Sequence, residues 1–251
     1  MSRQERIDAH LVAGGKYHDF DFARLELLKL LAEHSQVRVS VGSDYADSEA
    51  IANSRCLVTY TCDVRPTTAQ QDVLARFVRE GGRWLALHGT NSALDFTAKG
   101  VSSPRCFPTF AHVLGSQFVA HPEVQPYRVS VCAEHALVAG IEPFDTDDEL
   151  YLSEYHEREQ LVPLLDTRYR GSAAGFVESD WSGGDDRRLV SYLRPHGRGA
   201  VLYNTLGHCR GHHDMRPVMD WYPRVERCSW ERPQYYELLR RGIRWALGEL
   251  A

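Results

Sequence analysis

Three histidines occupy positions where their imidazoles could share one chemical task. His18, His88 and His208 each follow a short apolar run of the kind that forms a buried strand. Neutral imidazoles bind zinc, nickel, iron and copper, and near neutral pH they also act as general acids and bases. Carboxylates that could complete such a site are also present: Asp19, Asp63 and the acidic run at 145–149.

The elements that must position these histidines alternate between strand and helix patterns. Apolar or alternating runs predict strands at 7–13, 37–41, 56–61 and 84–87, and later at 127–132, 161–169, 189–193 and 200–206. Helical periodicity predicts helices at 20–33, from Thr68 to the Gly81-Gly82 stop, and at about 233–247. Thr68 and Gln71 have the spacing of a capping box. This order predicts a flavodoxin-like, doubly wound α/β fold with a mostly parallel sheet and helices on both faces.

In such sheets, ligands bind beyond the carboxyl ends of the strands. The segment 16–19 follows the first strand, Cys62 and Asp63 follow the third, and His88 and His208 follow two others. We therefore expect the imidazoles of His18, His88 and His208 to lie in one pocket. A divalent metal such as zinc held there would polarise a carbonyl or hydroxyl, or activate a water. By itself, an acidic run such as 145–149 is more typical of a solvated loop.

Composition and missing motifs exclude several classes of function. The 251 residues are 43% hydrophobic and 25% charged, with a formal charge of -5, which is not typical of a nucleic-acid-binding protein. No apolar run is long enough for a membrane span, and the N-terminal residues do not resemble a signal peptide. The six cysteines form no C-x-x-C pair, which predicts reduced thiols in a cytoplasmic protein. Because both G-x-G-x-x-G and the P-loop motif are missing, we expect no nucleotide cofactor.

Six separated blocks of the sequence follow the order of blocks in a known family. They are YHDF at 17–20, LALHG at 85–89, LGSQF and the following HP at 114–122, EHALVAGI at 134–141, DELY at 148–151 and GRGAVLYNTLGH at 197–208. In these blocks the chain resembles the ThuA-like family, named for trehalose utilisation, which shares the class I glutamine amidotransferase-like fold. The resemblance runs from about residue 7 to 208, and we expect 1–251 to form one domain.

The resemblance implies an enzyme of carbohydrate metabolism that acts on a disaccharide or keto-sugar derivative by hydrolysis, elimination or isomerisation. In glutamine amidotransferases of this fold the turn after the strand carries a nucleophilic cysteine, whereas here that position is His88, so glutaminase activity is not expected. The catalytic candidates are His88, Glu149 and His208, and the metal-ligand candidates are His18, His88 and His208. The candidates for substrate binding are Tyr17, His18, Asp19, Asn91, His121 and Tyr151.

Two questions remain open at the level of sequence. A non-catalytic sugar-binding or regulatory module is the alternative to an enzyme, since folds are reused without their chemistry. The segment 210–234 is rich in aromatic residues and departs from the family pattern. Aromatic side chains in such a segment pack or form a subunit contact more often than they stack on a sugar, which leaves a homo-oligomer open.

Overall fold

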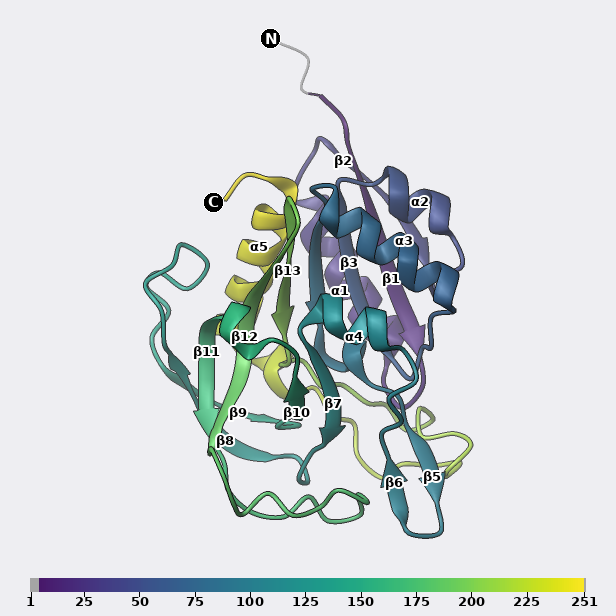
Figure 1. Ribbon diagram of the computed structural model, residues 1–251, viewed down its shortest axis with the longest axis vertical. Helices are drawn as coiled ribbons and strands as arrows, with labels where there is room; N and C mark the ends of the chain where they lie inside the picture. The colour runs from purple at the N-terminus through teal and green to yellow at the C-terminus, as the bar shows by residue number, and fades with distance from the viewer. Residues whose placement is uncertain (1–4, 251) are drawn as a thin grey trace.

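A nine-stranded sheet runs through the protein in the computed structural model, which describes residues 5–250 (Figure 1). One half of the sheet is parallel. The parallel strands, in their order across the sheet, are β2 (Val37–Gly42), β1 (Ile7–Gly15), β3 (Cys56–Cys62), β4 (Arg83–Leu87) and β13 (Gly199–Asn204). The strands β1 to β4 are connected by crossovers, and β13, which follows β12 (Arg187–His196) by a hairpin, pairs parallel with β4. This confirms the predicted α/β class, and the carboxyl ends of these strands form the edge where the histidines emerge.

The other half of the sheet is antiparallel and continues from β13. Its strands are β12 (Arg187–His196), β11 (Val162–Arg168), β8 (Gln125–Val131) and β9 (Phe144–Asp148). The acidic run that was expected to be a solvated loop is largely strand β9, and that expectation was wrong. Alternate residues of β9 are buried and exposed, so Asp145 and Asp147 face solvent while Asp148 points inward. The polar alternation of a half-buried strand explains why composition alone suggested a loop.

Helices cover both faces of the parallel half (Figure 1). On one face α1 (Phe20–Ala32) and α5 (Pro233–Leu247) pack with Leu27, Leu239 and their neighbours against β1, β3 and β4. On the other face lie α2 (Ser48–Asn53), α3 (Thr68–Arg79) and α4 (Pro108–Leu114). The capping box of α3 is formed by Thr67 and Gln70, one residue before the predicted pair. Gln71 is instead buried, and its side chain accepts a hydrogen bond from the backbone of Phe110 at the start of α4.

The structure also contains shorter elements that the sequence did not predict. They are the pair β7 (Ser116–Ala120) and β10 (Leu152–Tyr155), the hairpin of β5 (Asp95–Thr97) and β6 (Gly100–Ser102), and the 3-10 turns η1 (His88–Asn91), η2 (Arg158–Gln160) and η3 (Cys228–Glu231). Elements of three to five residues carry too little periodicity to be recognised in a sequence.

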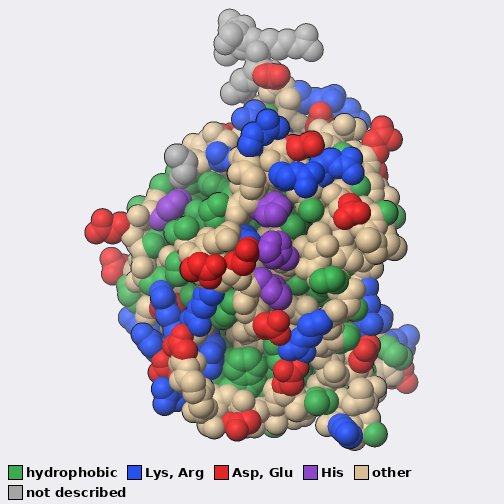
Figure 2. Space-filling view, in the orientation of Figure 1, with side chains coloured by type: hydrophobic (Ala, Val, Ile, Leu, Met, Phe, Trp, Pro, Cys, Tyr) green, Lys and Arg blue, Asp and Glu red, His purple; other side chains and the backbone are tan. Residues whose placement is uncertain are grey.

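The surface gives little further indication of function. Acidic and basic side chains are interspersed over the face shown in Figure 2. Within residues 5–250, no helix combines the length and the hydrophobicity that a membrane span requires.

Candidate metal centre

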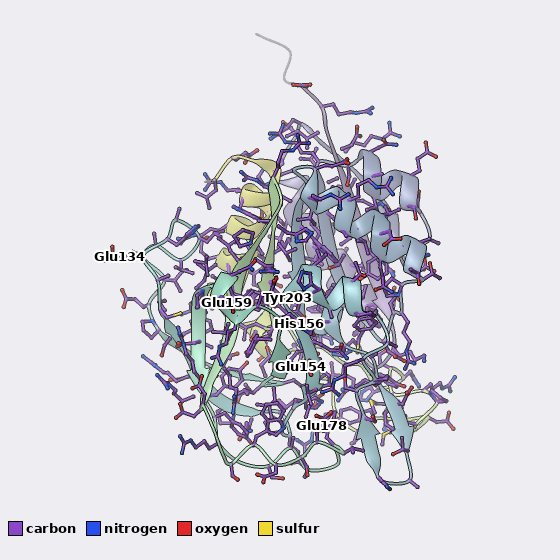
Figure 3. The ribbon with its side chains drawn as sticks, viewed as in Figure 1. Glu134, Glu154, His156, Glu159, Glu178 and Tyr203 are labelled. Atoms are coloured by element: carbon purple, nitrogen blue, oxygen red, sulfur yellow. The ribbon has the colours of Figure 1, made fainter. Side chains whose placement is uncertain are left out.

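Three of the strand ends at the carboxyl edge have strained backbone conformations. Tyr17, Asp63 and His88 have positive φ values of 73°, 54° and 44°. Residues other than glycine rarely adopt positive φ values, and such backbone strain concentrates at functional sites. His88 is the first residue of η1, directly after β4, so the turn directs its side chain inward from the end of the strand. The hydroxyl of Tyr203 (labelled in Figure 3) donates to the carbonyl oxygen of His88 at 2.5 Å and secures this turn.

Gly89 allows the turn that carries His88 to approach β3 closely. A Cβ atom at this position would lie 2.7 Å from the carbonyl oxygen of Thr61 and 2.9 Å from the Cβ of Cys62. We therefore expect Gly89→Ala to destabilise the protein by about 1–3 kcal/mol, because backbone and a buried side chain must move apart. Thermal unfolding would measure this loss. Gly183→Ala is the control, since no atom lies within 4 Å of its added Cβ, and an equal effect of both variants would contradict the steric explanation.

The imidazoles of His18 and His88 face each other through their Nε2 atoms. His88 Nδ1 donates to the carbonyl oxygen of Thr205 at 2.8 Å, and His18 Nδ1 donates to the carbonyl oxygen of Lys16 at 3.2 Å. Because a carbonyl only accepts hydrogen bonds, both Nδ1 atoms carry protons, and each neutral ring has its lone pair on Nε2. The two Nε2 atoms are 2.8 Å apart. Two lone pairs at this distance repel each other unless a proton or a metal ion lies between them.

His208 supplies a third nitrogen to the same point. Its Nε2 bonds to the Glu226 carboxylate at 2.8 Å and must therefore donate. Its buried Nδ1 forms no hydrogen bond of good geometry, although it lies 3.2 Å from Glu149 Oε1. Donor atoms of His18, His88, His208 and Glu149 all lie within 4.8 Å of one another, and all four residues are buried. Three imidazoles and one carboxylate suit zinc or another first-row transition metal.

The outer hydrogen bonds of these histidines follow the pattern of known metal sites. Ligating histidines usually donate their second N–H to a carbonyl or a carboxylate, which fixes the ring and its tautomer. Here the acceptors are Lys16 O for His18, Thr205 O for His88 and the Glu226 carboxylate for His208. The unpartnered Nδ1 of His208 and the two facing Nε2 atoms thus fit a metal ion as the missing partner.

Burial and neighbouring charges shift the protonation of the cluster in opposite directions. Burial lowers the pKa of His18 well below its usual value, and His88 and His208 lower it further. Burial alone would raise the pKa of Glu149, but His121 and His208 outweigh it and hold that pKa well below the usual value. Burial would likewise lower the pKa of His208, but Glu149 and Glu226 raise it to about 9. An incoming metal ion would therefore displace a proton from His208.

A pocket of about 440 Å³ opens above the cluster. Its volume falls in the range of small-molecule sites, about 300–1,000 Å³. Glu149 and His121 line it, with Arg210 bridging Glu149 and Glu226 at 3.3 and 3.2 Å. His121 Nδ1 donates to the carbonyl oxygen of Pro122 at 2.7 Å, which leaves the lone pair of the neutral ring on Nε2, 3.6 Å from Glu149. Burial lowers the pKa of His121, which favours this neutral form.

The predicted site residues fall into three groups. The structure brings His18, His88, His208 and Glu149 together, but the three histidines lie behind the floor of the pocket rather than lining it. Tyr17 and His121 line the pocket. The remaining candidates, Asp19, Asn91 and Tyr151, do not: Asp19 caps α1 and pairs with Arg227, Asn91 donates to Ser116, and the Tyr151 hydroxyl lies 3.3 Å from His88 Nε2.

Sequence reasoning missed three charged residues of the site. Arg210 and Glu226 belong to the segment 210–234, which crosses the carboxyl edge and lines the pocket instead of only packing against the sheet. Asp148 is fully buried and accepts hydrogen bonds from the backbone of Glu149, Gly207 and His208. The position of Asp148 beside Glu149, within one family block, was the available signal for it.

Cys62 does not replace the cysteine nucleophile of the amidotransferases. It is the last residue of β3 rather than the residue of the turn after β4, and burial raises the pKa of its thiol well above the usual value. A buried, protonated thiol is a poor nucleophile. The absence of glutaminase activity remains a prediction.

Fold and site together define a flavodoxin-like α/β protein with a buried histidine–carboxylate cluster at the carboxyl edge of its parallel strands. The family model ThuA, described as trehalose utilisation, matches residues 11–221, and the chain belongs to this family. No curated protein sequence matches it significantly.

Solved structures agree on the fold. A ThuA-like protein from Bacteroides uniformis superposes with a TM-score of 0.70 at 17% identity, covering 100% of this chain and 95% of that one. A ThuA-like protein from Parabacteroides merdae superposes with a TM-score of 0.68 at 14% identity, covering 98% of this chain and 92% of that one. A β-galactosidase from Rahnella sp. R3 superposes with a TM-score of 0.53 at 14% identity, and 98% of this chain matches 31% of that enzyme.

Proposed function

We propose that this protein is a metal-dependent enzyme that acts on a sugar derivative, with a keto-sugar or an oxidised disaccharide as its substrate. The observation that carries the proposal is the convergence of three imidazole nitrogens and the Glu149 carboxylate beneath a pocket of small-molecule size. His18, His88, His208 and Glu149 would hold the ion. A bound divalent ion would supply Lewis-acid polarisation of a carbonyl or hydroxyl oxygen.

The residues of the pocket suit proton transfer next to a carbonyl group. His121 exposes a neutral Nε2 to the pocket and is the candidate general base. It would take a proton from the carbon beside the carbonyl; the C–H electron pair would form a C=C bond, the carbonyl π pair would move to the oxygen, and the positive charge of Arg210 would stabilise the resulting enolate. Return of the proton to the former carbonyl carbon, with transfer of the proton of the adjacent hydroxyl to the former carbonyl oxygen, completes an isomerisation. Alternatively, the carbonyl re-forms, a C=C bond forms to the next carbon, and the oxygen substituent of that carbon leaves with the proton, which completes an elimination.

The sugar class is supported by the family and by the lining of the pocket. The family description is trehalose utilisation. Glu149, Arg210 and Glu226 line the pocket and offer hydrogen-bonding groups for hydroxyls. Neither feature distinguishes a monosaccharide from a disaccharide.

The test is metal analysis of protein purified without a histidine tag, followed by turnover assays on keto-sugars. We expect close to one transition-metal ion per chain, retained in the His213→Ala control and lost in His88→Ala and His208→Ala. His213 is exposed and outside the cluster. A chelator should abolish turnover and zinc or manganese should restore it. Absence of metal after supplementation, or turnover that survives the chelator, would contradict the proposal.

One observation favours a second candidate, a non-catalytic sugar-binding module. The three clustered histidines lie behind the pocket floor, so a ligand could be bound without contact with them. Sugar affinity that survives His88→Ala, with no turnover of any keto-sugar by the metal-loaded protein, would support this candidate.

A further inference from the structure

The pocket over the metal centre is polar at its floor and apolar around its mouth. The side chains of Glu149, Arg210 and Glu226 are 3%, 11% and 12% exposed and form the deep end. More exposed positions around the opening carry Leu94, Phe96, Val101, Phe176, Met215 and Pro223. Phe96 is 48% exposed. Two charged residues, Glu123 and Arg224, complete the outer rim.

The apolar wall of the mouth is held together before any ligand binds. The backbone of Val101 in β6 donates to Gly175 at 2.8 Å, and Val177 donates to Val101 at 2.9 Å, so the loop carrying Phe176 is fixed to the β5–β6 hairpin. The ring of Phe96 lies 5.4 Å from that of Tyr17, and the ring of Phe176 lies 4.9 Å from that of His121. The apolar wall therefore joins the polar floor through these two aromatic contacts.

This distribution selects between two kinds of extended ligand. A second sugar ring in the mouth would place hydroxyl groups against Phe96, Val101 and Phe176, whose side chains offer them no hydrogen-bond partner. An aromatic ring would instead bury apolar area against the same side chains and could stack on them.

We propose that the mouth is a subsite for an aromatic substituent, so that the preferred ligand class is an aryl glycoside or its keto derivative, with the sugar at the floor. This inference rests on the proposed function for the orientation of the sugar. Independently of that orientation, the inference is that the mouth of the pocket prefers an aryl substituent to an alkyl or sugar substituent.

The test compares phenyl and methyl glucopyranosides, in both anomers, with phenol alone, by isothermal titration calorimetry of the protein as purified and of the same protein after metal supplementation. We expect one phenyl glycoside to bind about tenfold or more tightly than its methyl counterpart, because the phenyl ring buries apolar area in the mouth. Phenol alone should bind more weakly than the phenyl glycoside, because it leaves the floor empty. Equal affinity of the two glycosides, binding of phenol as tight as that of the phenyl glycoside, or no binding of either glycoside would each overturn the inference.

Two variants locate the preference in the mouth. Phe96→Ala and Phe176→Ala should remove most of the phenyl preference and leave methyl glycoside affinity within about twofold. The control is Leu25→Ala, which removes an exposed apolar side chain of α1 outside the pocket. Thermal unfolding identifies any variant that fails to fold, and the second phenylalanine then decides the outcome. A phenyl preference unchanged in both folded variants would refute the assignment.

The outcomes also separate this inference from the proposed function. A phenyl preference in a protein that binds no metal and turns over no keto-sugar would support the subsite while refuting the metal enzyme. Metal-dependent turnover of keto-sugars with no phenyl preference would support the metal enzyme and refute the aryl subsite.

Discussion

Replacing Glu149 by glutamine should nearly eliminate metal retention and lower turnover by about a hundredfold or more, because the site loses its only anionic ligand among the four clustered residues. The amide keeps the shape of the side chain but removes the charge that a divalent ion requires. The readouts are the metal content after dialysis and kcat on a keto-sugar that the parent protein turns over.

Glu226→Gln is the matched control for this variant. Glu226, like Glu149, contacts both His208 and Arg210, but it meets His208 on the nitrogen that faces away from the cluster. Because Glu226 is an outer hydrogen-bond partner, its replacement should lower metal affinity by only about 10–100-fold. Losses of equal size in the two variants would show that both carboxylates serve only to balance charge, and would contradict the ligand role of Glu149.

Replacing Asp148 by alanine should lower the free energy of unfolding by about 4 kcal/mol, because several buried donors lose their only acceptor at once. Its carboxylate accepts hydrogen bonds from the backbone of Glu149, His208, Gly207 and Ser229 at 2.8 to 3.3 Å, and from the hydroxyl of Ser229. Equilibrium unfolding in urea would measure the change, with an unchanged m-value as the check on two-state behaviour.

Asp145→Ala provides the comparison within the same strand. Asp145 is on the exposed side of β9 and pairs with the exposed Arg128 at 3.1 Å. Exposed ion pairs contribute about 0–1 kcal/mol, so this variant should be nearly neutral. If Asp148→Ala were as mild as Asp145→Ala, Asp148 would not be the residue that joins β9, the end of β13 and η3. A folded Asp148→Ala protein should also retain less metal, because Glu149 and His208 would lose their backbone support.

The sequence by itself determined the class of fold and the edge where the site lies. Strand and helix periods are local properties of the chain, and their alternation produces crossovers that turn every parallel strand in the same direction. Residues that follow different strands therefore meet at one edge, and this predicted the meeting of His18, His88 and His208. The family blocks added Glu149 and His121, which no local pattern distinguishes from loop residues.

Only the tertiary structure decided which atoms of the site are available. Whether a histidine presents Nδ1 or Nε2 depends on an acceptor from a distant segment, such as Thr205 O for His88 or Glu226 for His208. The depth of the cluster below the pocket, and the arrival of Arg210 and Glu226 from the segment 210–234, depend on how that segment crosses the sheet edge. Such non-local packing leaves no periodic trace in the chain, because each contact joins residues whose spacing in the sequence is arbitrary.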